Sequence, residues 1–481
     1  MPLKAKILNP RVAARAQMST SAIREVPKEL DTDEPHDVIF NNLYGLRTIE
    51  LNRPAKHNAL NGSMIRKIFP RLVEWEKSDM ANVIVIKGAG ERAFCAGGDV
   101  ATLALQNKEG PEGQRKSVDY FALEYRLDHY IATYQKPYIA FMDGFTMGGG
   151  VGLSIHAPFR IATEKTVFAM PETKIGFFPD VGASFFLPRM AGSVGTYLAL
   201  TSDLLKGANV FYSGIATHYL HSTSLPSLES RLAELRFKDY DSMEDRLAII
   251  EMTIEEYATG LPPGEPIYLG GELREAIDRC FSKNNVANII AALEQEEGST
   301  KAWAEKTLDA LHQRSPTSVH VALRQMRVGR EWSIAETFKR EHQIAARFME
   351  HPDFTEGVTA LLLSKEEPKP KPKWDPASLE DIEPGSNIAE PFFRTTGGPP
   401  TLNLVTDRDF SEYPYQSFGV PTEQEVETLV RVARLSPQEI REEFVRRKNG
   451  RQGISTIVDE ILARKTIVNE DGKAEWKDYL V

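Results

Sequence analysis

Short apolar runs alternate with longer helical patterns over the first half of the chain. Residues 83–86, 138–142 and 159–162 are predicted as buried strands, because each run has four or five residues, is rich in β-branched or aromatic side chains and is bounded by glycine, proline or charge. Apolar positions at helical spacing predict helices over residues 119–134 and 193–200. Strands that alternate with helices indicate an α/β fold.

The pattern becomes helical in the second half. Apolar residues recur at helical spacing from 228 to 311, and Ser315-Pro316 is typical of a helix start, with proline in the first turn. Lysine, glutamate and proline alone make up residues 365–373, which predicts a stiff charged linker. The compact core is therefore expected to end there.

The chain after this linker is predicted to be a separate piece. Residues 384–421 are rich in proline, glycine and threonine and are expected to be irregular. An apolar stripe at helical spacing covers residues 454–462. Such a stripe usually packs into a core, and docking onto a partner is the alternative. Two further helices are predicted from the capping boxes formed by Thr422 with Glu425 and by Ser436 with Glu439.

The first 24 residues differ in composition from the rest. They contain five basic residues and no acidic residue, and three hydroxyl side chains stand at residues 19–21. A basic, hydroxyl-rich and acid-free sequence is typical of a mitochondrial transit peptide. A disordered basic tail with no targeting function is the alternative. We therefore predict a leader over residues 1–35 and a mitochondrial protein.

Composition narrows the class of protein. Of the 481 residues, 41% are hydrophobic and 26% are charged, as in soluble globular proteins, and no apolar run approaches the roughly 18 residues of a membrane span. The net charge of −10 argues against a polyanion-binding surface over the whole chain. With only Cys95 and Cys280, a disulfide framework is excluded as the basis of the fold. Cys95 is interpreted as a small buried residue, because no histidine stands near it in sequence.

Three segments combine glycine with polar or carboxylate residues, at 93–99, 143–152 and 170–182. Glycine after a strand lets the backbone turn sharply and approach a ligand, and amides in the first turn of a following helix have no partner. Two such amides that converge on one oxygen stabilise an oxyanion, and losing one donor typically costs about 3 kcal/mol. Any one of these loops by itself is better explained as a tight turn.

The order and spacing of the three segments, together with Leu-Asn-Arg-Pro at 51–54 and Asn-Ala-Leu at 58–60, resemble the crotonase superfamily. The likeness is strong over residues 38–222 and weaker to about 382. It implies a spiral of ββα units in a crotonase-like core at 36–222, a helical region at 223–366, and a linker with a helical extension at 367–481. A closer likeness, to the 3-hydroxyisobutyryl-coenzyme A hydrolases, is carried by residues 146–153, 162–165, 168–173, 178–182, 315–318 and 353–358.

The resemblance also implies roles for individual residues. In crotonase-like enzymes two backbone amides hold the thioester carbonyl, and these fall on Gly98 and Gly149. The hydrolase family has a glutamate where Glu172 stands and an aspartate where Asp180 stands. It has a substrate-contacting glutamate where Glu124 stands.

The chemistry of these residues is coherent with thioester hydrolysis. Glu172 is predicted either to attack the carbonyl, which forms a mixed anhydride, or to activate water as a general base. Asp180 would orient the water or the 3-hydroxyl of the substrate, or raise the basicity of Glu172 by charge repulsion. The competing interpretations are a surface or helix-capping carboxylate for Glu172, a helix N-cap for Asp180 and a solvent-exposed side chain for Glu124.

Few other residues point to a ligand. Lys56 is a candidate contact for a coenzyme A phosphate, although a lone lysine usually belongs to the surface. His57, His156 and His218 lack metal-ligand spacing, so no metal site is predicted. Coenzyme A enters as part of the acyl-CoA substrate, and no separate cofactor is expected.

The first hypothesis is hydrolysis of a short-chain hydroxyacyl-CoA thioester in the mitochondrial matrix. The resemblance narrows the substrate to 3-hydroxyisobutyryl-CoA, as in valine breakdown. A hydratase or isomerase is disfavoured, because the hydratases carry a first catalytic glutamate where this chain has Gly152. No membrane partner is expected, and the trimers and hexamers of crotonase relatives leave self-association open.

The second hypothesis is a structural protein. Some fungal and plant relatives of the hydrolase family are found in the small subunit of the mitochondrial ribosome. The segment after Trp374 extends beyond the resemblance and contains Arg446-Arg447-Lys448 and Arg451, which are suited to docking on ribosomal protein or RNA. Glu442 and Glu443 adjoin this run, so a solvated helix face is the competing interpretation. Both roles can coexist, because the expected catalytic residues are all present.

Overall fold

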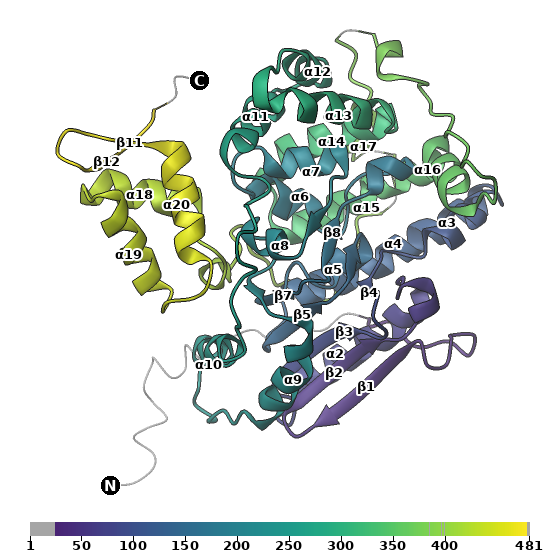
Figure 1. The fold of residues 1–481 in the computed structure, drawn as a ribbon. Helices are drawn as coiled ribbons and strands as arrows, with labels where there is room; N and C mark the ends of the chain where they lie inside the picture. Colours follow the sequence, from purple (N-terminus) through teal and green to yellow (C-terminus); the bar gives the residue numbers. More distant parts are fainter. Residues whose placement is uncertain (1–24, 384, 396, 399, 479–481) are drawn as a thin grey trace, which may run out of the picture.

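The computed structural model describes residues 25–478 apart from 384, 396 and 399, so the transit-peptide prediction for residues 1–24 lies outside the described part of the chain. A six-stranded sheet in the order β1-β2-β3-β5-β7-β10 occupies the lower part of Figure 1. β1 and β2 are antiparallel, and the other neighbours run parallel. The three predicted strands are confirmed as β3, β5 and β7. The strands are β1 (Val38–Leu43), β2 (Leu46–Leu51), β3 (Val83–Gly88), β5 (Tyr138–Met142), β7 (Phe159–Ala162) and β10 (His218–Tyr219).

A second, smaller sheet has the order β4-β6-β8-β9. Its first three strands run parallel, and each follows directly on a strand of the large sheet, so β3 leads to β4, β5 to β6 and β7 to β8. Helices α3 and α5 follow β4 and β6, which confirms the expected spiral of ββα units. Parallel strands end at one edge of their sheet, so the turns after β4, β6 and β8 meet there. The elements are β4 (Ala93–Cys95), β6 (Phe145–Met147), β8 (Val167–Ala169), β9 (Leu205–Lys206), α3 (Val100–Asn107) and α5 (Gly149–Gly152).

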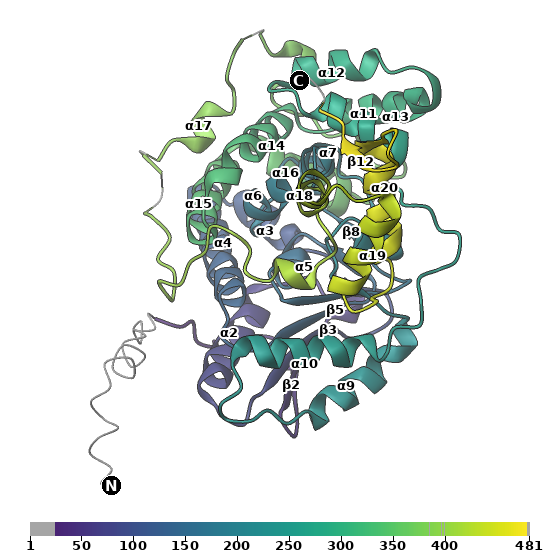
Figure 2. The ribbon, with the colours of Figure 1, turned by 90° about the vertical axis from the view of Figure 1, so that its left-hand side faces the viewer.

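Helices cover both faces of the large sheet. Alternate residues of β3 point to opposite faces, so Val83 and Val85 pack against α9 (Leu225–Glu234) and α10 (Met243–Glu255), while Ile84 and Ile86 enter the main core. Figure 2 shows α9 and α10 crossing in front of the sheet. Helix α2 (Gly62–Lys77) and the long helix α4 (Pro111–Ala132) belong to the main-core side. α4 begins about two turns before the predicted helix 119–134, with Pro111 in its first turn.

We call the part of the structure before the C-terminal helices the body, and its second half is helical, as predicted. Ser315 caps α14 by accepting a hydrogen bond from the Ser318 amide at 3.0 Å, and α15 packs along α4. No helix of the described residues is both long and apolar enough to cross a membrane. The helices are α6 (Ala183–Phe186), α7 (Val194–Thr201), α8 (Ala208–Tyr212), α11 (Gly271–Phe281), α12 (Val286–Glu294), α13 (Lys301–His312), α14 (Pro316–Val328), α15 (Ile334–Glu350), α16 (Pro352–Val358) and α17 (Glu390–Phe393).

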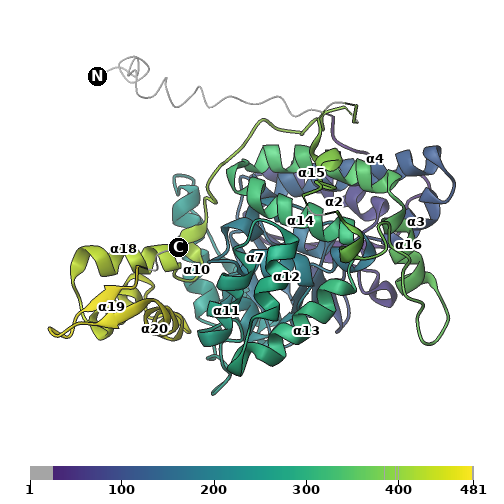
Figure 3. The ribbon, with the colours of Figure 1, turned by 90° about the horizontal axis from the view of Figure 1, so that it is seen from above.

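The C-terminal residues form a lobe beside this body, shown in yellow in Figure 1 and at the left of Figure 3. Both predicted capping boxes are present, and the stripe at 454–462 is buried within this chain. Arg451, whose side chain is 3% exposed, pairs with Glu251 at 3.1 Å and donates to the carbonyl of Thr217 at 2.6 Å. The lobe is thus packed onto the body. It comprises α18 (Glu423–Ala433), α19 (Pro437–Arg447), α20 (Ile454–Lys465), β11 (Thr466–Val468) and β12 (Ala474–Trp476).

Candidate active site

The glycine turns after β4 and β6 lie against each other. A side-chain Cβ built on Gly149 would stand 3.3 Å from the amide nitrogen of Gly98 and 3.5 Å from the carbonyl carbon of Gly97. Gly148 reaches this approach with a φ of 44°, which favours glycine. The structure therefore brings together the two turns whose amides were predicted to act as a pair.

Both amides are free to bind a ligand. The Leu60 amide donates to Gly97 at 2.8 Å and the Asp99 amide donates to Leu60 at 2.8 Å, which leaves the intervening Gly98 N–H without an acceptor among the described residues. Gly149 is the first residue of α5, where an amide has no partner within the helix, and the described residues supply none. Two free donors on touching turns are the elements of an oxyanion site.

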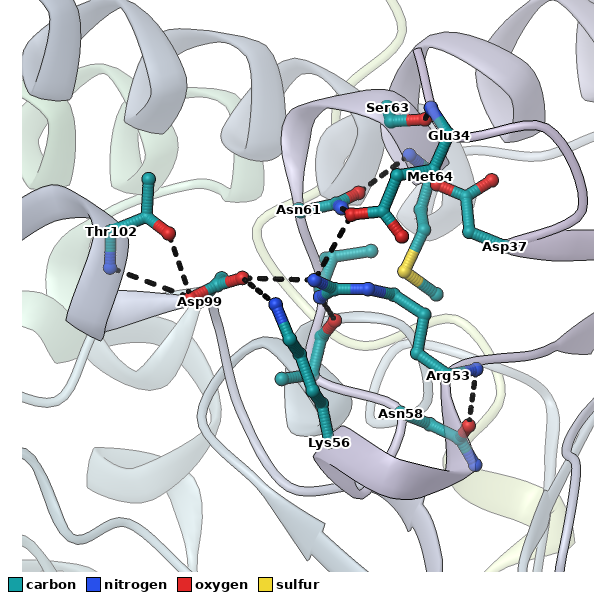
Figure 4. Close-up of polar contacts among 12 residues, drawn as sticks. Glu34, Asp37, Arg53, Lys56, Asn58, Asn61, Ser63, Met64, Asp99 and Thr102 are labelled. Carbon is teal, nitrogen blue, oxygen red and sulfur yellow. Dashed lines mark hydrogen bonds and ion pairs between the residues drawn. The ribbon is translucent and has the colours of Figure 1, made fainter. Parts of the chain in front are cut away.

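A buried arginine holds the first turn in place, as Figure 4 shows. Arg53 donates to Asp99 at 3.1 Å and to the carbonyl of Ala59 at 2.7 Å. Asp99 in turn caps α3 by accepting a hydrogen bond from the Thr102 amide at 3.4 Å, and it also accepts one from the Thr102 hydroxyl at 3.1 Å. Lys56 lies on the solvent side of this cluster, with its side chain 62% exposed and its Nζ 3.9 Å from Asp99. A coenzyme A contact for Lys56 stays a prediction.

Glu172 stands next to the second turn. It opens the short 3-10 helix Glu172–Ile175 after β8, and its Oε1 lies 3.1 Å from the place of a Cβ on Gly148. The residue is 5% exposed, and Oε2 has no hydrogen-bond partner among the described residues. Burial, followed by the charge of Asp180, raises the pKa of Glu172 well above its usual value. The surface-carboxylate interpretation is therefore wrong.

Asp180 faces the same interior. It is 4% exposed and accepts a hydrogen bond of 2.7 Å from the hydroxyl of Tyr125 on α4. The N-cap of α6 is Gly182, so the helix-cap interpretation of Asp180 is wrong. Burial raises the pKa of Asp180 to about 7, although the Tyr125 hydrogen bond opposes the shift. The charge repulsion expected between Asp180 and Glu172 thus contributes to the raised pKa of Glu172.

Glu124 reaches the same place from α4. It is 2% exposed, which excludes the solvent-exposed interpretation, and its Oε1 lies 2.5 Å from the place of a Cβ on Gly149. That oxygen has no hydrogen-bond partner among the described residues. Burial, followed by the charge of Asp180, raises the pKa of Glu124 well above its usual value.

Two more buried carboxyl groups were not predicted. Asp128, one turn after Glu124 on α4, is fully buried, and neither of its carboxyl oxygens has a hydrogen-bond partner in the described chain. Glu341 on α15 accepts from the amides of Gly182 at 2.7 Å and Ser184 at 2.9 Å, and burial raises its pKa to about 8. The sequence held a signal for Asp128, because it stands four residues after Glu124 and so on the same side of the helix. It held no signal for Glu341, which lies 161 residues beyond Asp180.

We call Glu124, Asp128, Glu172, Asp180 and Glu341 the acid cluster. Two other predictions concern residues that do not belong to it. Cys95 is buried, and burial raises the pKa of its thiol to about 12, consistent with a packing role. Over residues 25–478, apart from the three positions not described, no group of three or more histidine, cysteine, aspartate or glutamate side chains is placed to hold a metal ion.

Comparison with known proteins identifies the family. The family described as "Enoyl-CoA hydratase/isomerase" matches residues 46–393. The chain belongs to this family. "Small ribosomal subunit protein mS47" of Neurospora crassa is 59% identical over 99% of this chain and 94% of its own length. The "3-hydroxyisobutyryl-CoA hydrolase, mitochondrial" of Gallus gallus is 44% identical over 73% of this chain and 87% of its own.

Solved structures agree with this assignment. A carnitinyl-CoA dehydratase from Mycobacterium thermoresistibile has a TM-score of 0.66 and 32% identity, and covers 77% of this chain and 99% of its own. An enoyl-CoA hydratase from Rhodobacter sphaeroides has a TM-score of 0.64 and 31% identity, and covers 76% of this chain and 100% of its own. The family resemblance and the crotonase-like fold expected from the sequence are thereby confirmed.

Proposed function

We propose that the protein hydrolyses a short-chain hydroxyacyl-CoA thioester in mitochondria, with 3-hydroxyisobutyryl-CoA as the substrate. The observation that carries this proposal is the buried carboxylate of Glu172, with one oxygen unpartnered, against two touching turns whose amides are free. The printed names of the hydrolase relatives, 42–44% identical, supply the acyl group and the compartment.

The reaction needs a charge-stabilising site and an attacking group. The thioester carbonyl oxygen accepts hydrogen bonds from Gly98 and Gly149, which stabilise the negative charge of the tetrahedral state. Glu172 either adds to the carbonyl carbon, giving an anhydride that water then cleaves, or takes a proton from a water that attacks directly. In both routes the C–S bond breaks, the thiolate leaves with its electron pair and takes up a proton, and the acyl group ends as a carboxylate.

The surroundings favour Glu172 as a base or nucleophile. No lysine or arginine of the described residues forms an ion pair with Glu172, Asp180 or Glu124, so nothing neutralises an ionised carboxylate there. The raised pKa of Glu172 therefore makes its ionised form a stronger proton acceptor than an exposed glutamate. Turnover is expected to rise with pH through this raised value.

Glu172→Gln tests the proposal, because it removes the attacking or basic oxygen and keeps the shape of the side chain. We expect kcat for 3-hydroxyisobutyryl-CoA hydrolysis to fall by roughly 10²–10⁴, the usual contribution of general acid–base catalysis. Glu366→Gln, an exposed position in the linker, is the matched control and should keep wild-type turnover. Hydrolysis at the wild-type rate by folded Glu172→Gln protein would contradict the assignment.

We propose as a second function that the protein associates with the mitochondrial small ribosomal subunit. The likeness to the Neurospora protein supports this, because it spans the C-terminal lobe as well as the body. A Schizosaccharomyces pombe protein with the same printed name is 42% identical over 75% of this chain. Neither likeness conflicts with retained hydrolysis, because the acid cluster and the glycine turns are intact.

Co-sedimentation of the full chain with mitochondrial small subunits tests this association. Deleting the lobe would also remove Arg451 from its buried contacts, so point variants are the better design. The double substitution Arg446→Glu and Arg447→Glu reverses the charge of two side chains on α19 that are 74% and 49% exposed. We expect this double variant to lose co-sedimentation and keep thioester hydrolysis. A wild-type chain that migrates only as free protein at low salt would contradict ribosome association.

A further inference from the structure

One face of α4 lies over three glycines of the site. Tyr120, Glu124 and Asp128 are spaced by four residues, so their side chains project from the same side of the helix. Each places an oxygen where a glycine side chain would begin. The Tyr120 hydroxyl is 3.1 Å from the Cβ position of Gly98, Glu124 Oε1 is 2.5 Å from that of Gly149, and Asp128 Oδ2 is 2.6 Å from that of Gly152.

Asp128 obstructs position 152 with its whole carboxyl group. The Cβ position of Gly152 lies 2.6 Å from Oδ2, 2.9 Å from Oδ1 and 2.9 Å from Cγ of Asp128. Real Cβ atoms essentially never come within 3.0 Å of another group, so any side chain at 152 requires Asp128 to move. Asp128 is fully buried among packed neighbours, which makes such a movement costly.

A side chain at 152 would matter because of its place on α5. Residue 152 is three positions after Gly149, and residues at this spacing lie on one side of a helix. A carboxyl group at 152 would therefore approach the acyl group beside the Gly149 amide, in addition to Glu172. The chain has no side chain there, and the carboxyl of Asp128 fills that volume from α4.

A second carboxyl group decides which reaction such a site supports. Hydration of an enoyl thioester forms a bond from the water oxygen to Cβ, and the electron pair of the double bond takes up a proton at Cα. One carboxylate accepts a proton from the water and another carboxyl group supplies the proton at Cα. Hydrolysis of a thioester needs only the attacking group and the amide donors, which this site has.

We propose that Asp128 is a specificity-determining residue: by filling the space beside Gly152 it excludes a carboxyl-bearing side chain from α5 and restricts the site to hydrolysis. This proposal rests on the hydrolase function proposed above. It explains how a backbone similar to that of an enoyl-CoA hydratase is kept from adding water to a double bond.

The steric part of the proposal is tested by a double-mutant cycle on thermal stability. Gly152→Ala should lower Tm in the wild-type chain, and Asp128→Ser should relieve a large part of that loss by opening space. Burial, followed by the charge of Glu124, raises the pKa of Asp128 well above its usual value, and the shorter serine side chain removes the carboxyl group that stands at the Gly152 Cβ position. Ser117→Ala is the matched control, because Ser117 is also buried on α4 but donates to Leu103. Equal Tm losses from Gly152→Ala in the Asp128→Ser and Ser117→Ala backgrounds would overturn the proposal.

The specificity part is tested with crotonyl-CoA as the enoyl substrate. Asp128→Ser combined with Gly152→Glu should hydrate it at least about 100-fold faster than either single variant, the lower end of a general acid–base contribution. Asp128→Ser with Gly152→Asp replaces this variant if the glutamate protein does not fold. Absence of hydration in a folded double variant, or equal hydration by Gly152→Glu alone, would overturn the proposal.

The same experiments separate this proposal from the hydrolase function. A wild-type chain that hydrolyses no hydroxyacyl-CoA thioester would refute the proposed function, whereas the stability cycle at positions 128 and 152 does not depend on any activity. If the wild-type chain hydrolyses the thioester but the Tm cycle shows no coupling between positions 128 and 152, only the role of Asp128 is refuted.

Discussion

Gly149→Ala is the smallest change that tests the paired amides. The added methyl group would lie 2.5 Å from Glu124 Oε1 and 3.3 Å from the Gly98 nitrogen, so it would crowd both the carboxylate and the first of the two donors. A Cβ atom essentially never comes within 3.0 Å of a non-bonded heavy atom, so either Glu124 or the α5 turn must move. Because the turns already touch, even a shift of a few tenths of an ångström changes the spacing of the two amides.

The magnitude follows from the loss of one donor. An oxyanion donor contributes about 3 kcal/mol to the transition state, so kcat for thioester hydrolysis should fall roughly 10²–10³-fold. KM should change less, because these donors act mainly on charge that develops in the transition state. Steady-state hydrolysis with free thiol detection measures both constants.

Gly398→Ala is the matched control for Gly149→Ala. A Cβ on Gly398 would have its nearest neighbour, a side-chain nitrogen of Arg347, at 3.7 Å. The position is exposed and is remote in sequence from the glycine turns of the site. Its kcat should equal that of the wild type. A Gly149→Ala protein that stays folded and turns over at the wild-type rate would refute the reasoning about the two amides.

Three further predictions concern the buried polar groups. Tyr125→Phe removes the 2.7 Å hydrogen bond to Asp180, so the pKa of Asp180 should rise and the acidic limb of the kcat/KM profile should shift to higher pH; an unshifted profile would contradict this. Burial raises the pKa of Asp180 to about 7 and of Glu341 to about 8, so the folded chain retains protons that the unfolded chain has released. The free energy of unfolding should therefore fall between about pH 5 and pH 8, by up to about 1.4 kcal/mol per pH unit for each proton, and Glu341→Gln should flatten the upper part of a urea-unfolding series. Arg451→Ala breaks buried contacts to Glu251 and two carbonyls, and should lower the free energy of unfolding by about 3 kcal/mol; unchanged urea unfolding would show that the lobe is not held there.

The elements of the fold were largely predictable from local patterns. Strands β3, β5 and β7 and helix α14 carry their signals in a few neighbouring residues, as do the capping boxes at Thr422 and Ser436. The hairpin of β1 and β2 was not predicted, because the outer strand has mostly exposed residues and its apolar run is only three residues long. The docking of the C-terminal lobe was also missed, because it depends on Arg451 reaching Glu251 and Thr217, which lie 200 and 234 residues earlier in the chain.

The candidate site was predictable in part. Glycines after strands and a carboxylate-rich loop drew attention to Gly98, Gly149, Glu172 and Asp180, and the structure brings these residues together. Nothing in their immediate sequence showed that Glu341 would join them from α15. Their surroundings depend on how α4 and α15 pack across the turns.

The sequence by itself determined which segments become strands and helices, and where the backbone is free to turn, because periodicity and glycine act over a few residues. Only the tertiary structure decided that carboxyl groups from four separate segments share one buried space, and that α4 stands over the three glycines. Burial and the distance between groups remote in sequence are properties of packing. The raised pKa values and the obstruction of position 152 therefore appear only once the chain is folded.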